Sequence, residues 1–113
     1  MLFRSMFMFK ADILAFGVHP DDVELGCAGT LIASIAQGKK VVVADLTRGE
    51  LGTRGNAETR TIEAANAAMV MGVHARENLD MPDGFFANNE GNIKKVIEVI
   101  RKYQPEKIGR AHV

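Results

Sequence analysis

The 113-residue sequence is poor in several features, and each shortage excludes a class of protein. Its single cysteine, Cys27, excludes an internal disulfide and fits a reducing compartment, so we expect a cytoplasmic protein. The 14 basic and 14 acidic residues give a formal net charge of zero, which offers no attraction to nucleic acid or to an anionic membrane. No apolar run reaches the roughly 20 residues that a membrane-spanning helix needs.

Residues 1–10 are mostly apolar and include one early arginine. They are too short to span a membrane, and no small-residue cleavage site follows them. We therefore expect an N-terminal extension rather than a signal peptide or an anchor. The rest of the chain has the length of one domain with a single hydrophobic core.

The sequence changes character at Gly17, where an apolar run gives way to a histidine and two carboxylates, His19, Asp21 and Asp22. A helical pattern begins directly afterwards, so this order predicts a strand, a tight turn and a helix. In an open α/β sheet, ligands bind beyond the carboxyl ends of the strands. We therefore expect these three side chains at the binding edge of the sheet.

His19 and Asp22 are three residues apart at the expected helix start, so their side chains can converge on one point. An imidazole nitrogen and a carboxylate oxygen suit a catalytic zinc site with three protein ligands and one open position, and another divalent metal would also fit. Asp21 points elsewhere and is free to accept a proton. An alternative stays open on these residues alone: both aspartates could serve only to start the helix, as an N-cap and as partners of the helix dipole.

A second alternative is a non-catalytic, Rossmann-like module that binds a nucleotide or a phosphate at the same edge. The turn Gly17-x-His19 does not give the Gly-x-Gly-x-x-Gly spacing that a pyrophosphate needs. Metal analysis would separate this class of protein from a metal-dependent enzyme.

The hydrophobic pattern predicts strands and helices in alternation. Apolar strands are expected at 13–16, 40–45 and 75–79 and from about 106, and helices at 24–37, 57–71 and 92–103. The positions expected to be buried are Leu25, Ala28, Leu31, Ile32, Ile35 and Ala36 in the first helix, and Ile62, Ala65, Ala68, Met69 and Val70 in the second. We predict an α/β fold, a Rossmann-like three-layer parallel sheet with the first strand central and crossover helices on both faces.

Two arginines follow the second expected strand. Arg48 lies in a polar, glycine-rich loop, residues 47–55, which we expect beside His19 because consecutive parallel strands are usually neighbours. Arg60, in the first turn of the next helix, could form a surface ion pair with Glu63 or point back and hold a substrate hydroxyl or anionic group. His74 precedes the third strand and is expected on the surface at the opposite end of the sheet.

These motifs together resemble a known family. Residues 19–31 are similar to the signature of the PIG-L/LmbE-like zinc N-deacetylases, which remove acetyl groups from N-acetylglucosamine-containing molecules. Within the family, the resemblance is closest to the bacillithiol-biosynthesis branch, which deacetylates N-acetylglucosaminyl malate. Four motifs in the same order are far more specific than any one of them. The match runs from about residue 12 to residue 108, and its later motifs are Asp45–Gly55, Glu58–Ala64 and Asn78–Gly84.

The resemblance implies a reaction and a role for particular residues. Zinc would be held by His19, Asp22 and a histidine from later in the family's sequence. Asp21 would act as the general base, and Arg60, with Arg48 as a second candidate, would bind the small-molecule amino-sugar substrate.

The last residues depart from the family pattern. In the family, a longer strand leads into a second histidine cluster, whereas His112 is the only histidine in this region and follows Pro105 too closely for a full strand. We expect an extension at 1–10, the N-terminal part of a single LmbE-like deacetylase domain at 11–108 with its C-terminal part missing, and a non-family tail at 109–113. Such a chain is expected to be inactive alone, and its open fourth-strand edge favours a homo-oligomer.

Overall fold

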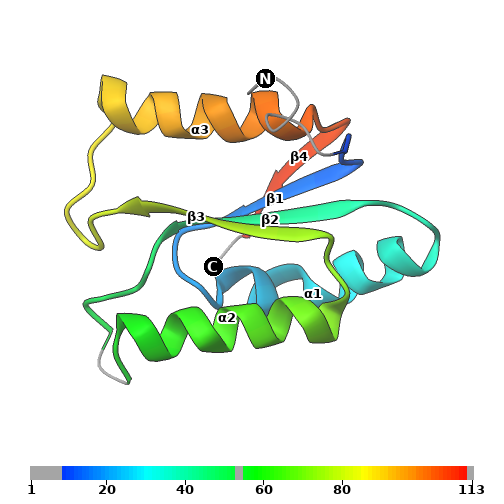
Figure 1. Cartoon of the computed structure of the whole chain (residues 1–113), viewed down its shortest axis with the longest axis horizontal. Coiled ribbons are helices and arrows are strands. Elements are labelled where there is room, and N and C mark those ends of the chain that lie inside the picture. Colours follow the sequence, from blue (N-terminus) through cyan, green and yellow to red (C-terminus); the bar gives the residue numbers. More distant parts are fainter. Residues whose placement is uncertain (1–8, 53–54, 112–113) are drawn as a thin grey trace.

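The structure, a computed structural model, describes residues 9–52 and 55–111 (Figure 1). Its strands form one parallel sheet in the order β3-β2-β1-β4. Helices α1 and α2 cover one face of the sheet and α3 covers the other (Figure 1). The predicted three-layer α/β fold is therefore confirmed. The elements alternate along the chain as β1 (Ile13–Gly17), α1 (Asp22–Ala36), β2 (Val41–Thr47), α2 (Ala57–Met71), β3 (Ala75–Met81), α3 (Glu90–Tyr103) and β4 (Lys107–Arg110).

Strand β1 lies inside the sheet, as predicted. It pairs with β2 through Ile13–Gly17 and with β4 through Ile13–Phe16. Because the strands are parallel, the loops after β1, β2 and β3 all leave from one edge of the sheet. Strand β4 includes residues 109 and 110, which the sequence pattern assigned to the tail. No helix in the described part of the chain combines the length and the hydrophobicity needed to cross a membrane.

The sheet is buried on both faces. Val41–Ala44 of β2 have no exposed surface, which explains why this strand reads as a continuous apolar run. Leu14 and Val42 pack with Tyr103 on the α3 side, whereas Val43 packs with Val23 on the α1 side. Each side chain of the strand thus has a helix to pack against.

The predicted buried face of α1 is partly wrong. Leu31 is buried, but Leu25 is 82% exposed and Ile32 is 45% exposed. The helix is interrupted at Cys27, whose φ of −152° is not helical. Residues before and after this kink do not follow one helical repeat, so a stripe drawn through both halves does not lie on one face.

The predicted buried face of α2 is also wrong. Ile62, Met69 and Val70 are each more than half exposed, and Ala64 and Met71 are buried instead. The exposed and the buried residues both repeat at helical spacing. The sequence pattern favoured the exposed set as the buried face because its side chains are larger and more apolar. The small side chain of Ala64 lets the helix lie close to the layer below it.

One buried cation joins the sheet to both helices on the α1 side. Arg76 of β3 donates to both carboxylate oxygens of Asp45 on β2, at 2.7 and 3.0 Å. It also donates to both oxygens of Glu24 in the first turn of α1, at 3.0 and 2.9 Å, and to the Ala64 carbonyl of α2 at 3.3 Å. These bonds use the guanidinium's full set of five donors. Burial opposes the charge, but the two carboxylates hold the pKa of Arg76 above its ordinary value.

Arg76→Met should lower the free energy of unfolding by about 3–5 kcal/mol, because it leaves two carboxylates in a buried site without their cation. Urea denaturation followed by circular dichroism measures this loss. Arg101→Met, on the exposed side of α3, is the matched control and should change stability by less than about 0.5 kcal/mol. Equal urea midpoints for the two variants would show that the cluster does not stabilise the fold.

A partly buried carboxylate on β3 makes stability depend on pH. Glu77 accepts hydrogen bonds from Lys102 Nζ at 2.7 Å and from the Tyr103 hydroxyl. Burial alone would raise the pKa of Glu77, but these two donors hold it below its ordinary value of 4.5. A carboxyl with a lowered pKa in the folded state contributes stability above about pH 4.5 and loses it as the pH falls further.

Glu77→Gln should therefore make the loss of stability between about pH 6 and pH 3 shallower, because this variant has no carboxylate to protonate at position 77. Urea midpoints at several pH values measure the slope. Glu98→Gln, an exposed position on α3, should keep the wild-type slope. If both variants keep it, the Glu77 contacts do not produce the acid sensitivity.

Candidate active site

The turn between β1 and α1 holds its two aspartates differently. Asp22 is 15% exposed in its side chain, and its Oδ2 accepts the backbone amide of His19 at 3.0 Å. Asp21 is the N-cap residue of α1, yet within the described chain its side chain makes no capping hydrogen bond, and it is 51% exposed. The helix-start alternative therefore does not explain the Asp21 carboxylate.

The ring of His19 is held by a carboxylate from the third loop of this edge. His19 Nε2 lies 2.7 Å from Oδ1 of Asp83, a buried residue that follows β3. The other Asp83 oxygen accepts the Leu51 amide at 3.0 Å, and the Asp83 amide donates to Glu50 Oε2 at 2.9 Å. Burial alone would raise the pKa of Asp83, but the Leu51 amide and the His19 ring hold it below its ordinary value.

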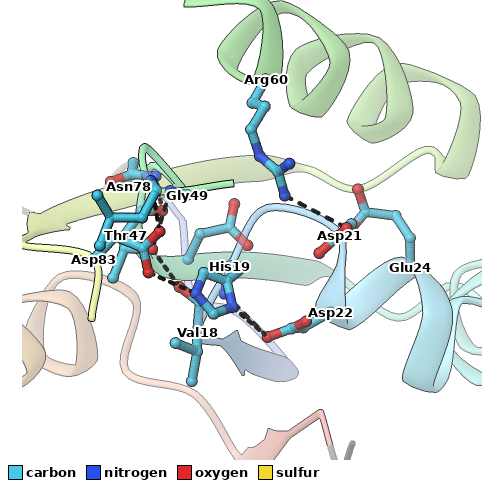
Figure 2. Close-up of polar contacts among 12 residues, drawn as sticks. Val18, His19, Asp21, Asp22, Glu24, Thr47, Gly49, Arg60, Asn78 and Asp83 are labelled. Atoms are coloured by element: carbon cyan, nitrogen blue, oxygen red, sulfur yellow. Dashed lines mark hydrogen bonds and ion pairs between the residues drawn. The ribbon is translucent and has the colours of Figure 1, made fainter. Parts of the chain in front are cut away.

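The bond to Asp83 determines which nitrogen of His19 faces the site. An ionised carboxylate only accepts hydrogen bonds, so Nε2 is the nitrogen that donates to Asp83, and the one neutral tautomer compatible with this bond presents a lone pair at Nδ1. Nδ1 lies 3.6 Å from Asp22 Oδ2 (Figure 2). Two acceptors at this separation attract a cation between them.

This pair fits two positions of a divalent-metal site. Two ligand atoms bound to one tetrahedral zinc at its usual bond lengths are roughly 3.4 Å apart, close to the separation of His19 Nδ1 and Asp22 Oδ2. Within residues 9–52 and 55–111, no group of three or more histidines, cysteines and acidic residues is arranged to hold a metal ion. His112, the sequence candidate for a third ligand, lies outside the described residues.

Buried polar contacts fix the first two loops against each other. Thr47, at the end of β2, donates to the Val18 carbonyl from its amide at 2.9 Å and from its hydroxyl at 3.0 Å. Its Oγ1 accepts the Gly49 amide at 3.1 Å, and the Asn78 side chain of β3 donates to the Thr47 carbonyl at 2.7 Å. Figure 2 shows these contacts beside His19, the residue that they hold in place.

Arg60 points back from α2 toward the first loop (Figure 2). Its Nη2 lies 3.5 Å from Asp21 Oδ2, and most of its side chain is buried. The ion pairs among the described residues thus join Arg60 to Asp21 rather than to Glu63. Of the two alternatives that the sequence left open, the geometry favours the one in which Arg60 turns to the site.

His19, Asp21, Arg60 and Asp83 line a cavity of about 400 Å³, whereas Asp22 is not part of its lining. The lining does not include Arg48, whose Nε donates to Asp80 Oδ1 at 2.8 Å and whose Nη1 donates to the Thr61 hydroxyl at 3.4 Å. A substrate role for Arg48 therefore stays a prediction. The residues that line the cavity are His19, Asp21, Gly49, Leu51, Gly52, Arg60, Asp83 and Gly84.

Sequence reasoning missed two residues of the site. The sequence pattern includes Asp83 only as part of the Asn78–Gly84 motif and gives it no role, although its place after the third strand is a usable signal. Nothing in the sequence indicates a site role for Thr47, because threonine is common at strand ends. Its hydrogen bond to the Val18 carbonyl is visible only in the structure.

Fold and site together define an α/β domain with an imidazole, carboxylates and a guanidinium gathered at the carboxyl edge of a parallel sheet. The family model described as GlcNAc-PI de-N-acetylase, PIG-L, matches residues 14–110. The chain belongs to this family of de-N-acetylases.

Relatives of known structure or sequence agree with this assignment. The uncharacterized deacetylase YaiS of Escherichia coli (strain K12) is 38% identical over 74 residues, 66% of this chain and 40% of YaiS. N,N'-diacetylchitobiose deacetylase from Pyrococcus horikoshii is 26% identical, with a TM-score of 0.80 over 87% of this chain and 40% of that one. The conserved protein TT1542 from Thermus thermophilus is 27% identical, with a TM-score of 0.69 over 91% of this chain and 68% of that one. The chain thus spans about 40% of the length of YaiS.

Proposed function

We propose that this chain carries part of the active site of a zinc-dependent N-deacetylase that acts on an N-acetylglucosamine conjugate. The observation that best supports the proposal is the separation of 3.6 Å between His19 Nδ1 and Asp22 Oδ2. Asp21 lines the cavity beside this pair. Membership of a de-N-acetylase family supports the reaction. The third ligand would come from outside the described residues.

In this proposal His19 and Asp22 hold the metal and Asp21 moves protons. A divalent metal held by His19 and Asp22 would lower the pKa of a water molecule and polarise the acetyl carbonyl. The Asp21 carboxylate accepts a proton from the attacking water and returns it to the nitrogen as the amide C–N bond breaks, which gives acetate and a free amine. Asp21 suits this role because its carboxylate is half exposed and is not used as a helix cap.

Arg60 is the residue proposed to orient the substrate. Besides the cavity shared with His19, it lines a neighbouring cavity of about 490 Å³ between the start of α1 and α2, and Asp21 lines both. A conjugate with two parts can therefore place its acetamide beside His19 and its second part against Arg60. Of the described residues that line this second cavity only Arg60 is cationic, beside the carboxylates of Asp21, Glu24 and Glu63, so a carboxylate such as that of malate would have to pair with its guanidinium. The choice of the bacillithiol branch as the source of the substrate rests on the sequence resemblance.

The structure offers little to a phosphate-binding module at this edge. The first turn of α1 carries the carboxylates of Asp22 and Glu24, which would repel an anion at the helix N-terminus. Asp21 adds a third carboxylate at the cap. We therefore retain the metal-dependent hydrolase as the proposed function.

Removing either proposed ligand should weaken Zn²⁺ binding about tenfold or more, because each of His19→Ala and Asp22→Asn deletes one of two protein ligands. Equilibrium dialysis with metal analysis by mass spectrometry measures the affinity. Asp80→Asn removes an exposed carboxylate that pairs with Arg48 and should bind zinc like the wild type. Undiminished binding by both ligand variants would refute the proposed metal site.

Asp21→Asn should keep the wild-type affinity for zinc and lower turnover by about 10²- to 10⁴-fold, because it removes the group that moves the proton. Acetate release from N-acetylglucosaminyl malate measures turnover, in a form of the protein long enough to supply the third ligand. Asp12→Asn changes a carboxylate that binds the Lys40 amide outside the cavity, and it should leave turnover unchanged. A rate unaffected by Asp21→Asn would remove this residue from the reaction.

A further inference from the structure

A four-residue turn, Gly49-Glu50-Leu51-Gly52, lies between Asp83 and Arg60 in the lining of the cavity. The proposed chemistry does not use it. The Gly52 amide donates to the Gly49 carbonyl at 3.0 Å and closes the turn. Its two central residues hold Asp83, through the Leu51 amide at 3.0 Å and the Glu50 carboxylate at 2.9 Å. One side of the turn is thus fixed to the carboxylate that holds His19.

The two glycines of the turn face Arg60. A Cβ atom on Gly52 would lie 2.9 Å from Arg60 Nη1, and one on Gly49 would lie 2.7 Å from Arg60 Nε. Real Cβ atoms do not approach this closely, so the guanidinium occupies space that only glycine leaves open. The other side of the turn is therefore a surface of bare backbone against which Arg60 packs.

Among the residues that the structure describes, no hydrogen bond explains why the Arg60 guanidinium lies so close to this turn. Its Nε is buried and finds no hydrogen-bond partner among the described residues. Leaving a buried donor unpartnered is unfavourable, so the position must come from the shape of the turn and from the attraction of Asp21, 3.5 Å from Nη2.

We infer that the turn is a spacer that sets the distance between Arg60 and His19, and that Gly49 and Gly52 are positioning residues of the site. The inference rests on the proposed function, in which Arg60 orients the substrate. Because Asp83 holds the turn from one side, a side chain at either glycine moves the guanidinium and not His19. The glycines therefore determine which substrates can reach both groups at once.

Gly52 gives the cleaner test. Gly49 has a φ of +67°, so any other residue there also strains the backbone. Gly52 has no such conformation, and Gly52→Ala changes mainly the space beside Arg60, with the Gly49 carbonyl 3.1 Å from the added atom. Gly29→Ala in α1 is the matched control, because a Cβ there meets nothing within 4 Å.

The first measurement follows Arg60 itself, without ligand or activity. In ¹H–¹⁵N NMR spectra of the chain, the Arg60 Nε–H signal is identified because it disappears in Arg60→Lys. The rate at which the Nε proton exchanges with solvent is then measured. In Gly52→Ala the chemical shift of this signal should change, and the Nε proton should exchange with solvent at least about tenfold faster, because the guanidinium leaves its buried position. Gly29→Ala should leave it unchanged. An unchanged Arg60 signal in folded Gly52→Ala overturns the inference.

The second measurement connects the position to binding. The affinity for N-acetylglucosaminyl malate should fall at least about tenfold in Gly52→Ala when position 60 is arginine, and by less than about twofold when it is lysine. An equal loss in both backgrounds would show general damage and overturn the inference. If the wild type and Arg60→Lys bind the compound equally, Arg60 does not bind the substrate, and this part of the proposed function is wrong. The hydrogen-exchange measurement does not depend on that result and still tests whether the turn sets the position of Arg60.

Discussion

The carboxyl edge of this sheet depends on the burial of Arg76 between two carboxylates. Burying a guanidinium between a sheet and its helices is energetically unfavourable unless its N–H donors are hydrogen-bonded. Asp45 from the next strand and Glu24 from α1 accept four of these bonds. Glu24 lies in the same helical turn as Asp22, so the start of the helix cannot shift along the sheet without breaking its two bonds to Arg76. The interaction that stabilises the layer therefore also fixes the helix that carries the proposed metal ligand and Asp21.

The loops above this edge are held largely by bonds between a backbone group of one loop and a side chain of another. The Val18 carbonyl accepts two bonds from Thr47, and the Leu51 amide donates to Asp83. Bonds of this kind need a particular side chain, such as Thr47 or Asp83, on one partner only, and the other partner contributes its backbone. The side chains that remain matter chiefly for the space they fill, which is why a residue without a side chain, Gly52, can decide the position of a long one, Arg60.

The sequence predicted the topology of the site better than its details. Parallel strands end at a common edge, so the order of strands alone brought His19 and Arg60 to one cavity. The sequence places Asp83 just after the third strand, but it could not show that this side chain meets His19, because a contact between two loops depends on loop conformations that periodicity does not encode. The helix faces failed for a related reason: the spacing that placed Leu25 in the core assumes an unbroken helix, and the break at Cys27 appears only in the backbone dihedral angles.

One turn holds the two neighbouring aspartates differently, and this difference suits the two roles proposed for them. Asp22 Oδ2 accepts the amide of His19, so the carboxylate is anchored to the same turn that carries the imidazole. Asp21 has extended φ and ψ near zero, −174° and −12°, and its carboxylate leaves the turn toward Arg60. A metal ligand must keep one position, whereas a base must gain and lose a proton and follow the substrate. Because Asp22 and His19 belong to one turn and Asp83 holds the imidazole ring from the third loop, the proposed ligand pair keeps its separation, whereas Asp21, the proposed base, has no such anchor within its own turn.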